Sequence, residues 1–217
     1  MTDQAPRALP RSLFAFAIFY GGMVCIAGVL ANKQVALGPL AVEAGIFAFL
    51  MLVTTSSAVA ELHGRDAANR LVLLGFVPLI VSTLLALLVL QLPAAHDMPA
   101  DRQSAFATIM GSTPRIWIGG IMAYGVSVSL NVWIFSRLKA REGAKLVWFR
   151  AGIASILSQI VDTLIFITVA FWGVFPADDF QNLLIGQTIA KIVLSAVLVP
   201  WLIYGFVALG RRLDSTA

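Results

Sequence analysis

Six apolar segments, each long enough to cross a lipid bilayer as a helix, run through this chain of 217 residues. They are 13–31, 40–60, 71–92, 116–135, 146–174 and 183–209. A transmembrane helix needs about 20 mostly apolar residues, whereas a soluble domain of this size buries a single core. Only 12% of the residues are charged, against about a quarter in soluble proteins. The sequence therefore predicts an all-α integral membrane protein, one domain over 1–217 with six transmembrane helices.

The basic residues predict the orientation of the chain. With six spans, both termini share a side with the connections after the second and fourth helices. Eleven of the fifteen Lys and Arg fall on that side: Arg7, Arg11, Arg65, Arg70, Arg137, Lys139, Arg141, Lys145, Arg150, Arg211 and Arg212. The positive-inside rule then places both termini in the cytoplasm. We expect a multi-pass protein of the bacterial inner membrane, whose net charge of +4 reflects orientation and not nucleic-acid binding.

The segment ends and connections add further expectations. The first apolar segment, 13–31, is longer than the core of about 7 to 15 residues in a secretory signal, so we expect it to stay in the mature chain. The longest connection, 93–114, is predicted to be an external loop. Trp117 and Trp172 are expected at the outer membrane interface.

Two charges are predicted to lie deep in the membrane, Asp162 in the fifth apolar segment and Lys191 in the sixth. They lie roughly 18 and 12 Å from the outer ends of consecutive antiparallel helices, at 1.5 Å of rise per residue, so we expect them to meet. Ser155, Ser158 and Gln159 share a helix face with Asp162. Such a stripe can be hydrogen-bonding glue between helices, but an ionisable group inside the membrane indicates a substrate or proton site.

Three more polar residues are weaker candidates for the site. Glu61 ends the second segment near the predicted cytoplasmic mouth, where a charge is often simply solvated. Asn131 lies near the inner end of the fourth segment and Asn32 at the outer end of the first. Asn is common at helix ends as a cap, so neither residue carries the hypothesis alone.

The chain lacks the reactive groups of an enzyme. Its two histidines, His63 and His96, fall in connections on opposite sides of the membrane, so we expect no Ser/His pair and no zinc-binding cluster. The single cysteine, Cys25, has no disulfide partner in the chain. No GxxxxGK[ST] segment is present to bind a nucleotide. We therefore expect a carrier of a small polar solute with no catalysis, cofactor or metal, and we leave a homo-oligomer open.

Four segments of the chain resemble the queuosine precursor transporter family, formerly grouped as vitamin uptake transporters. They are TTSSAVAELHGRDAANRLVLLGF, MAYGVSVSLNVWIFSRLKAR, WFRAGIASILSQIVDTLIFITVAFWGV and AKIVLSAVLVPWLIYGF, within about 32–205. The resemblance implies import of 7-deazaguanines, which are the 7-cyano and 7-aminomethyl precursors or queuine, for tRNA modification. The polar pattern of the family matches Asn32, Glu61 with Gly64, Asp162 and Lys191. Some family members have other residues at the positions of Ser57, Asn131 and Val128. These differences bear on which precursor is preferred.

The resemblance also gives the polar residues roles toward a nucleobase-like substrate. Asp162 would accept from the ring N–H and the exocyclic amine of a deazaguanine, a charge-assisted bidentate contact. Gln159 or Lys191 would donate to the carbonyl oxygen, and Phe166 would stack on the ring.

Two alternative functions remain at this stage. One is the substrate-binding subunit of an energy-coupling-factor vitamin importer, whose uptake would require a separate ATPase module. The other is a membrane scaffold in which Asp162 and Lys191 only neutralise each other.

Overall fold

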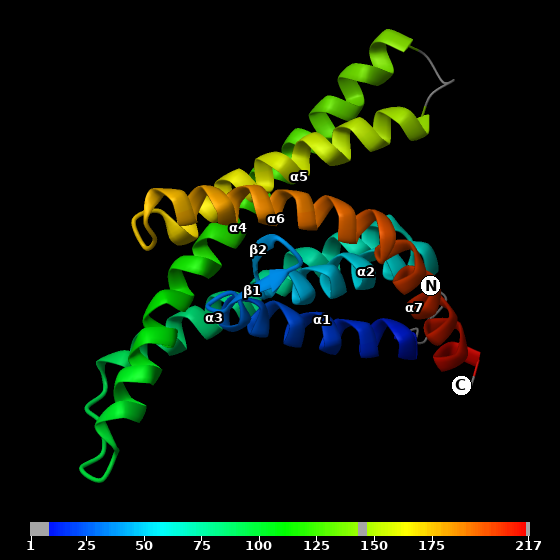
Figure 1. The fold of residues 1–217 in the computed structure, drawn as a ribbon. Coiled ribbons are helices and arrows are strands. Elements are labelled where there is room, and N and C mark those ends of the chain that lie inside the picture. Colours follow the sequence, from blue (N-terminus) through cyan, green and yellow to red (C-terminus); the bar gives the residue numbers. More distant parts are fainter. Residues whose placement is uncertain (1–8, 143–146, 216–217) are drawn as a thin grey trace.

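The computed structural model of this chain describes residues 9–142 and 147–215. Side chains at 128–129, 131–132, 135–142 and 147–155 lie outside that description. Along the chain the elements are α1 (Arg11–Leu30), β1 (Gln34–Leu37), β2 (Leu40–Glu43), α2 (Gly45–His63), α3 (Arg65–Gln91), α4 (Ala100–Glu142), α5 (Val147–Phe171), α6 (Ala177–Val197) and α7 (Val199–Ser215). Figure 1 shows α1, α2 and α3 packed together, with α4 and α5 paired along a second direction.

Several helices have the length and surface of membrane spans. Within the described residues α1, α2, α3 and α6 are long and apolar enough to cross a bilayer, and Ile156–Phe171 of α5 is a shorter apolar helix. Large apolar side chains of α3 point outward; Leu73 is 66% and Leu84 is 61% exposed. Such a surface is unfavourable in water and stable against lipid tails. The chain is thus a mostly helical, multi-pass membrane protein.

The start of the second apolar segment was predicted wrongly. A helix was expected from residue 40, but β1 and β2 form an antiparallel hairpin that pairs Gln34 with Glu43, and α2 begins only at Gly45. The hairpin turns at Gly38, whose φ of +60° suits glycine. The fold is therefore not purely α-helical, because this short segment of alternating Val and Leu, interrupted by Gly38-Pro39, favours paired strands.

The fourth predicted helix is longer than expected. Much of the expected external loop 93–114 is helical, because α4 begins at Ala100 and continues through Pro114 to Glu142. The hydroxyls of Thr108 and Thr113 donate to carbonyl oxygens one turn earlier, at 2.8 and 2.7 Å. Neither bond reaches the carbonyl of Met110, which Pro114 leaves without its usual helical donor. At 1.5 Å per residue, α4 is about 64 Å long, so it must extend well beyond a hydrocarbon layer of about 30 Å.

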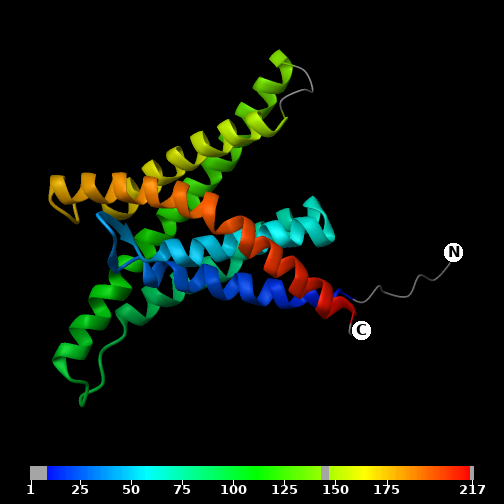
Figure 2. The ribbon, with the colours of Figure 1, turned by 45° about the vertical axis from the view of Figure 1, so that its right-hand side comes forward.

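The last apolar segment is two helices and not one. The expected continuous helix 183–209 is interrupted at Leu198, between α6 and α7. Pro200 has no N–H to donate and its ring crowds the carbonyl one turn earlier, so it ends α6 and is accepted in the first turn of α7. The bend between the two helices is visible in Figure 2.

The beginning of α1 and the end of α7 lie side by side (Figures 1 and 2), joined by a partly buried polar contact. The Ser12 hydroxyl donates to Asp214 Oδ2 at 2.7 Å and lies 2.6 Å from His63 Nε2. The expectation that no Ser/His pair forms was therefore wrong. Because Ser12 donates to Asp214, His63 must donate to Ser12, which is the reverse of the transfer that activates a nucleophilic serine. The contact ties α1, α2 and α7 together at one end.

Candidate functional site

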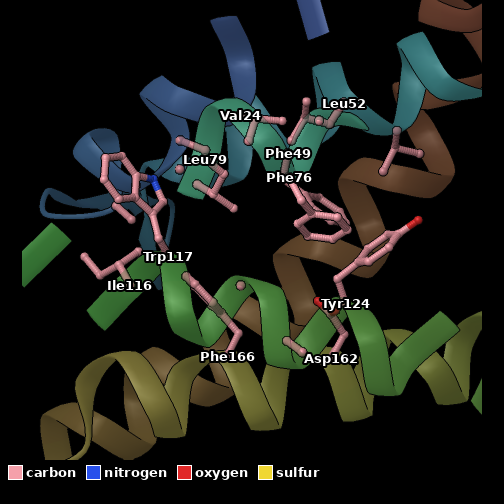
Figure 3. Close-up of a pocket in the computed structure, with 18 of the residues that line it drawn as sticks. Val24, Phe49, Leu52, Phe76, Leu79, Ile116, Trp117, Tyr124, Asp162 and Phe166 are labelled. Carbon is pink, nitrogen blue, oxygen red and sulfur yellow. The ribbon is translucent and has the colours of Figure 1, made fainter. Parts of the chain in front are cut away.

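A cavity of about 210 Å³ lies between the helices, lined by residues from α1 to α6 and from the end of β2. Most of its wall is apolar or aromatic, and its charged residues are Glu43, Asp162 and Lys191. Figure 3 shows the Phe76 and Tyr124 rings next to each other on one side of this cavity and Trp117 toward the other. A largely apolar cavity with a few convergent polar groups is the usual form of a small-molecule site.

Asp162 and Lys191 meet as predicted. The Lys191 ammonium donates to Asp162 Oδ2, and Ser127 donates to Asp162 Oδ1 at 3.0 Å. The Asp162 side chain is 13% exposed and the Lys191 side chain is 6% exposed. Helices α4, α5 and α6 thus each contribute one member of this network. Burying a charge pair costs desolvation free energy, and removing only one partner destabilises a protein strongly. Each charge therefore depends on the other for its place in the cavity.

Aromatic side chains surround the charge pair. The Lys191 ammonium lies 3.9 Å from the centre of the Phe49 ring, a cation–π contact. The Phe76 and Tyr124 rings pack edge to face with their centres 5.4 Å apart. Phe166, predicted to stack on a substrate ring, also lines the cavity. A flat aromatic body would find both polar partners and ring faces here.

Trp117 was expected at the outer membrane interface, but the structure places it inside the protein. It is only 6% exposed and lines the cavity, with its indole ring against Gly28 of α1. A Cβ on Gly28 would stand 2.2 Å from Trp117 Nε1, so the glycine makes room for the ring. Trp172, by contrast, is 65% exposed beside the end of α5, as an interface residue would be.

Glu43, like Ser127 and Gln187, is a polar residue of this region that sequence reasoning missed. It lines the cavity, is 4% exposed, and its Oε1 accepts from Gln187 Nε2 at 2.6 Å. Its backbone N–H donates to Gln187 Oε1 at 3.0 Å, so the two residues hold each other at two points. Its position inside the apolar segment 40–60 was a signal of the same kind that identified Asp162.

The other predicted site residues lie away from the cavity wall, or their side chains lie outside the described part of the structure. Gln159 is not part of the cavity wall, and its backbone carbonyl oxygen accepts from the Thr163 hydroxyl at 2.9 Å. Glu61 is exposed at the end of α2. Asn32 donates to the carbonyls of Gly28 and Val29 at 3.0 and 3.3 Å, so it caps α1. The Asn131 side chain lies outside the described residues. A direct role for any of these four stays a prediction.

The fold and the cavity define a class, that of small multi-pass membrane proteins with a largely apolar cavity between their helices. Residues 43–205 match the family described as "Putative vitamin uptake transporter". The chain is 30% identical over 186 residues to the "Probable queuosine precursor transporter" of Bacillus subtilis (strain 168), an alignment that covers 85% of this chain and 80% of that relative. It is 23% identical over 193 residues to the "Queuosine precursor transporter" of Escherichia coli (strain K12), over 86% and 82% of the two chains. No solved structure gives a significant match.

The chain belongs to the family of queuosine precursor transporters, formerly described as vitamin uptake transporters. The resemblance drawn from its sequence is thereby confirmed, and so is a transporter role.

Proposed function

We propose that this protein imports a 7-deazaguanine precursor of queuosine across the bacterial inner membrane and binds it in the central cavity. The observation that carries the proposal is the buried pair of Asp162 and Lys191 in the wall of an otherwise largely apolar and aromatic cavity. The names of its relatives supply the substrate class.

The chemistry of the cavity suits such a base. A deazaguanine is flat and aromatic, with a carbonyl oxygen beside a row of N–H donors. Lys191 has three donor positions and uses one toward Asp162, so it can also donate to the carbonyl oxygen. Phe49, Phe76 and Phe166 offer ring faces for the aromatic body. For Asp162 to accept the N–H edge as well, it must do so beside Lys191 and Ser127.

The test is uptake of a radiolabelled 7-deazaguanine by cells that lack their own importer and any energy-coupling ATPase module. Cells that express the chain should accumulate label well above cells that carry an empty vector. Uptake that appears only when an ATPase module is co-expressed would favour the importer-subunit alternative. A membrane-inserted protein that gives no uptake under either condition contradicts the proposal.

The membrane topology is a separate proposal. We infer six crossings, made by α1, α2, α3, α4, α5 and by α6 with α7 together, with both termini in the cytoplasm. A reporter fused after Ala217 should then be active only in the cytoplasm, since most of the basic residues fall on that side. Cleavage after Arg211 or Arg212 by a protease added outside intact cells would contradict this orientation.

A further inference from the structure

We propose that Glu43, and not Asp162, is the main acceptor for the N–H edge of the transported base. This inference rests on the proposed function, because it assigns a further contact within the same cavity. It begins from the acceptors that the cavity offers to a ligand.

The Asp162 carboxylate is already engaged. Oδ1 accepts from Ser127 at 3.0 Å and Oδ2 accepts from Lys191. Its side chain is 13% exposed, so a ligand reaches it only beside these two donors. A carboxylate that neutralises a buried ammonium is also poorly placed to move toward a substrate, because the separated charges would each lose their partner.

Glu43 is placed differently. Its Oε1 is held by Gln187, whereas its Oε2 is buried and has no well-aligned donor; the backbone N–H of Gly45 is close enough to satisfy it only in part. A buried carboxylate oxygen without a donor is unfavourable, and such groups in native proteins usually serve a partner that is absent or a function. Glu43 forms part of the cavity wall, so a small turn of its side chain would bring the covered Oε2 to a ligand, which can then supply the donor.

The arrangement around Glu43 matches a guanine-like edge. Such a base carries a ring N–H and an exocyclic amine next to a carbonyl oxygen, so its partner should offer an acceptor next to a donor. Glu43 supplies the acceptor, and Lys191 on α6 lines the same cavity and supplies a donor. The geometry therefore points to one ligand edge that is read by Glu43 for its donors and by Lys191 for its carbonyl.

The variant Glu43→Gln tests this reading with little change in shape. The amide oxygen should take the place of Oε1, because that position accepts from Gln187 Nε2. The NH₂ group then occupies the place of Oε2, so an acceptor becomes a donor that faces the donors of the base. We expect 7-cyano-7-deazaguanine to bind about tenfold or more weakly. The measurement is ligand-dependent thermal stabilisation of the purified full-length protein.

A second ligand tests the same contact from the other side. The analogue 7-cyano-7-deazahypoxanthine lacks the exocyclic amine and keeps the ring N–H and the carbonyl. The wild type should bind it about tenfold or more weakly than the deazaguanine, and Glu43→Gln should lose most of that preference. Asp179→Asn, which neutralises an exposed carboxylate in the first turn of α6, is the matched control and should behave as the wild type.

The outcomes separate the two proposals. If the wild type is stabilised by the deazaguanine and Glu43→Gln binds it equally well, the role of Glu43 is wrong and the proposed function stands. If no deazaguanine stabilises the wild type, the proposed function fails and the inference fails with it. Should Glu43→Gln not fold, Glu43→Asp replaces it. That variant should bind more weakly but keep the preference for the amine, and a lost preference or an unchanged affinity contradicts the inference.

Discussion

The double variant Asp162→Asn with Lys191→Met should reach the membrane in folded form and yet fail to bind 7-cyano-7-deazaguanine. Each single variant leaves one buried charge without its partner, which costs about 3 to 5 kcal/mol, whereas removal of both charges together is often nearly neutral. Both singles should therefore be less thermally stable than the double variant. Binding should not return with stability, because the ammonium that donates to the base carbonyl is gone.

The comparison of stability with binding is what decides the role of the pair. Thermal unfolding of the wild type, both singles and the double variant is measured with and without the ligand. If the double variant recovers both stability and ligand stabilisation, Asp162 and Lys191 only neutralise each other and the scaffold reading of this pair is correct. If it recovers stability alone, the pair belongs to the binding site.

The apolar pattern predicted most of the helices because lipid imposes a simple length requirement on each span. Five of the six expected segments contain or overlap a single long helix, and the contact of Asp162 with Lys191 followed from their depth on consecutive helices. The ends of segments were less predictable. Pro200 divides the last one, whereas Pro114 does not interrupt α4, although both residues lack the same hydrogen bond. Whether a proline breaks a helix depends on its neighbours, which hydropathy does not describe.

The part of the site that escaped prediction lies in the hairpin of β1 and β2. Four-residue strands give too short a pattern to be distinguished from the apolar start of a helix. Glu43 was therefore predicted to be part of the transmembrane helix 40–60. Its partner Gln187 is 144 residues away along the chain, and only tertiary packing brings the two together. Glu61 and Asn32 stood out in the sequence as polar residues at helix ends, but the structure places Glu61 in an exposed position and uses Asn32 as a cap.

Packing of that hairpin against α6 leads to the last prediction, that Gly186→Ala should destabilise the protein and weaken ligand binding. A Cβ on Gly186 would stand 2.2 Å from the carbonyl oxygen of Ala41 and 3.1 Å from its carbonyl carbon. Both atoms belong to the backbone of β2, so the strand itself must move, and overpacking of this kind costs about 1 to 3 kcal/mol. Because Glu43 ends the same strand and bonds to Gln187, the next residue of α6, the displacement should also disturb the carboxylate.

Gly22→Ala is the matched control, since Gly22 lies within α1 and a Cβ there would have nothing within 4 Å. Alanine is a better helix former than glycine by roughly 0.5 to 1 kcal/mol, so this variant should unfold at the wild-type temperature or slightly above it. Thermal unfolding with and without 7-cyano-7-deazaguanine gives both quantities in one series. Equal unfolding temperatures for Gly186→Ala and Gly22→Ala would show that the hairpin does not press on α6 as closely as the structure indicates. Reduced stability with unchanged ligand stabilisation would show instead that the hairpin supports the fold without positioning the carboxylate of Glu43.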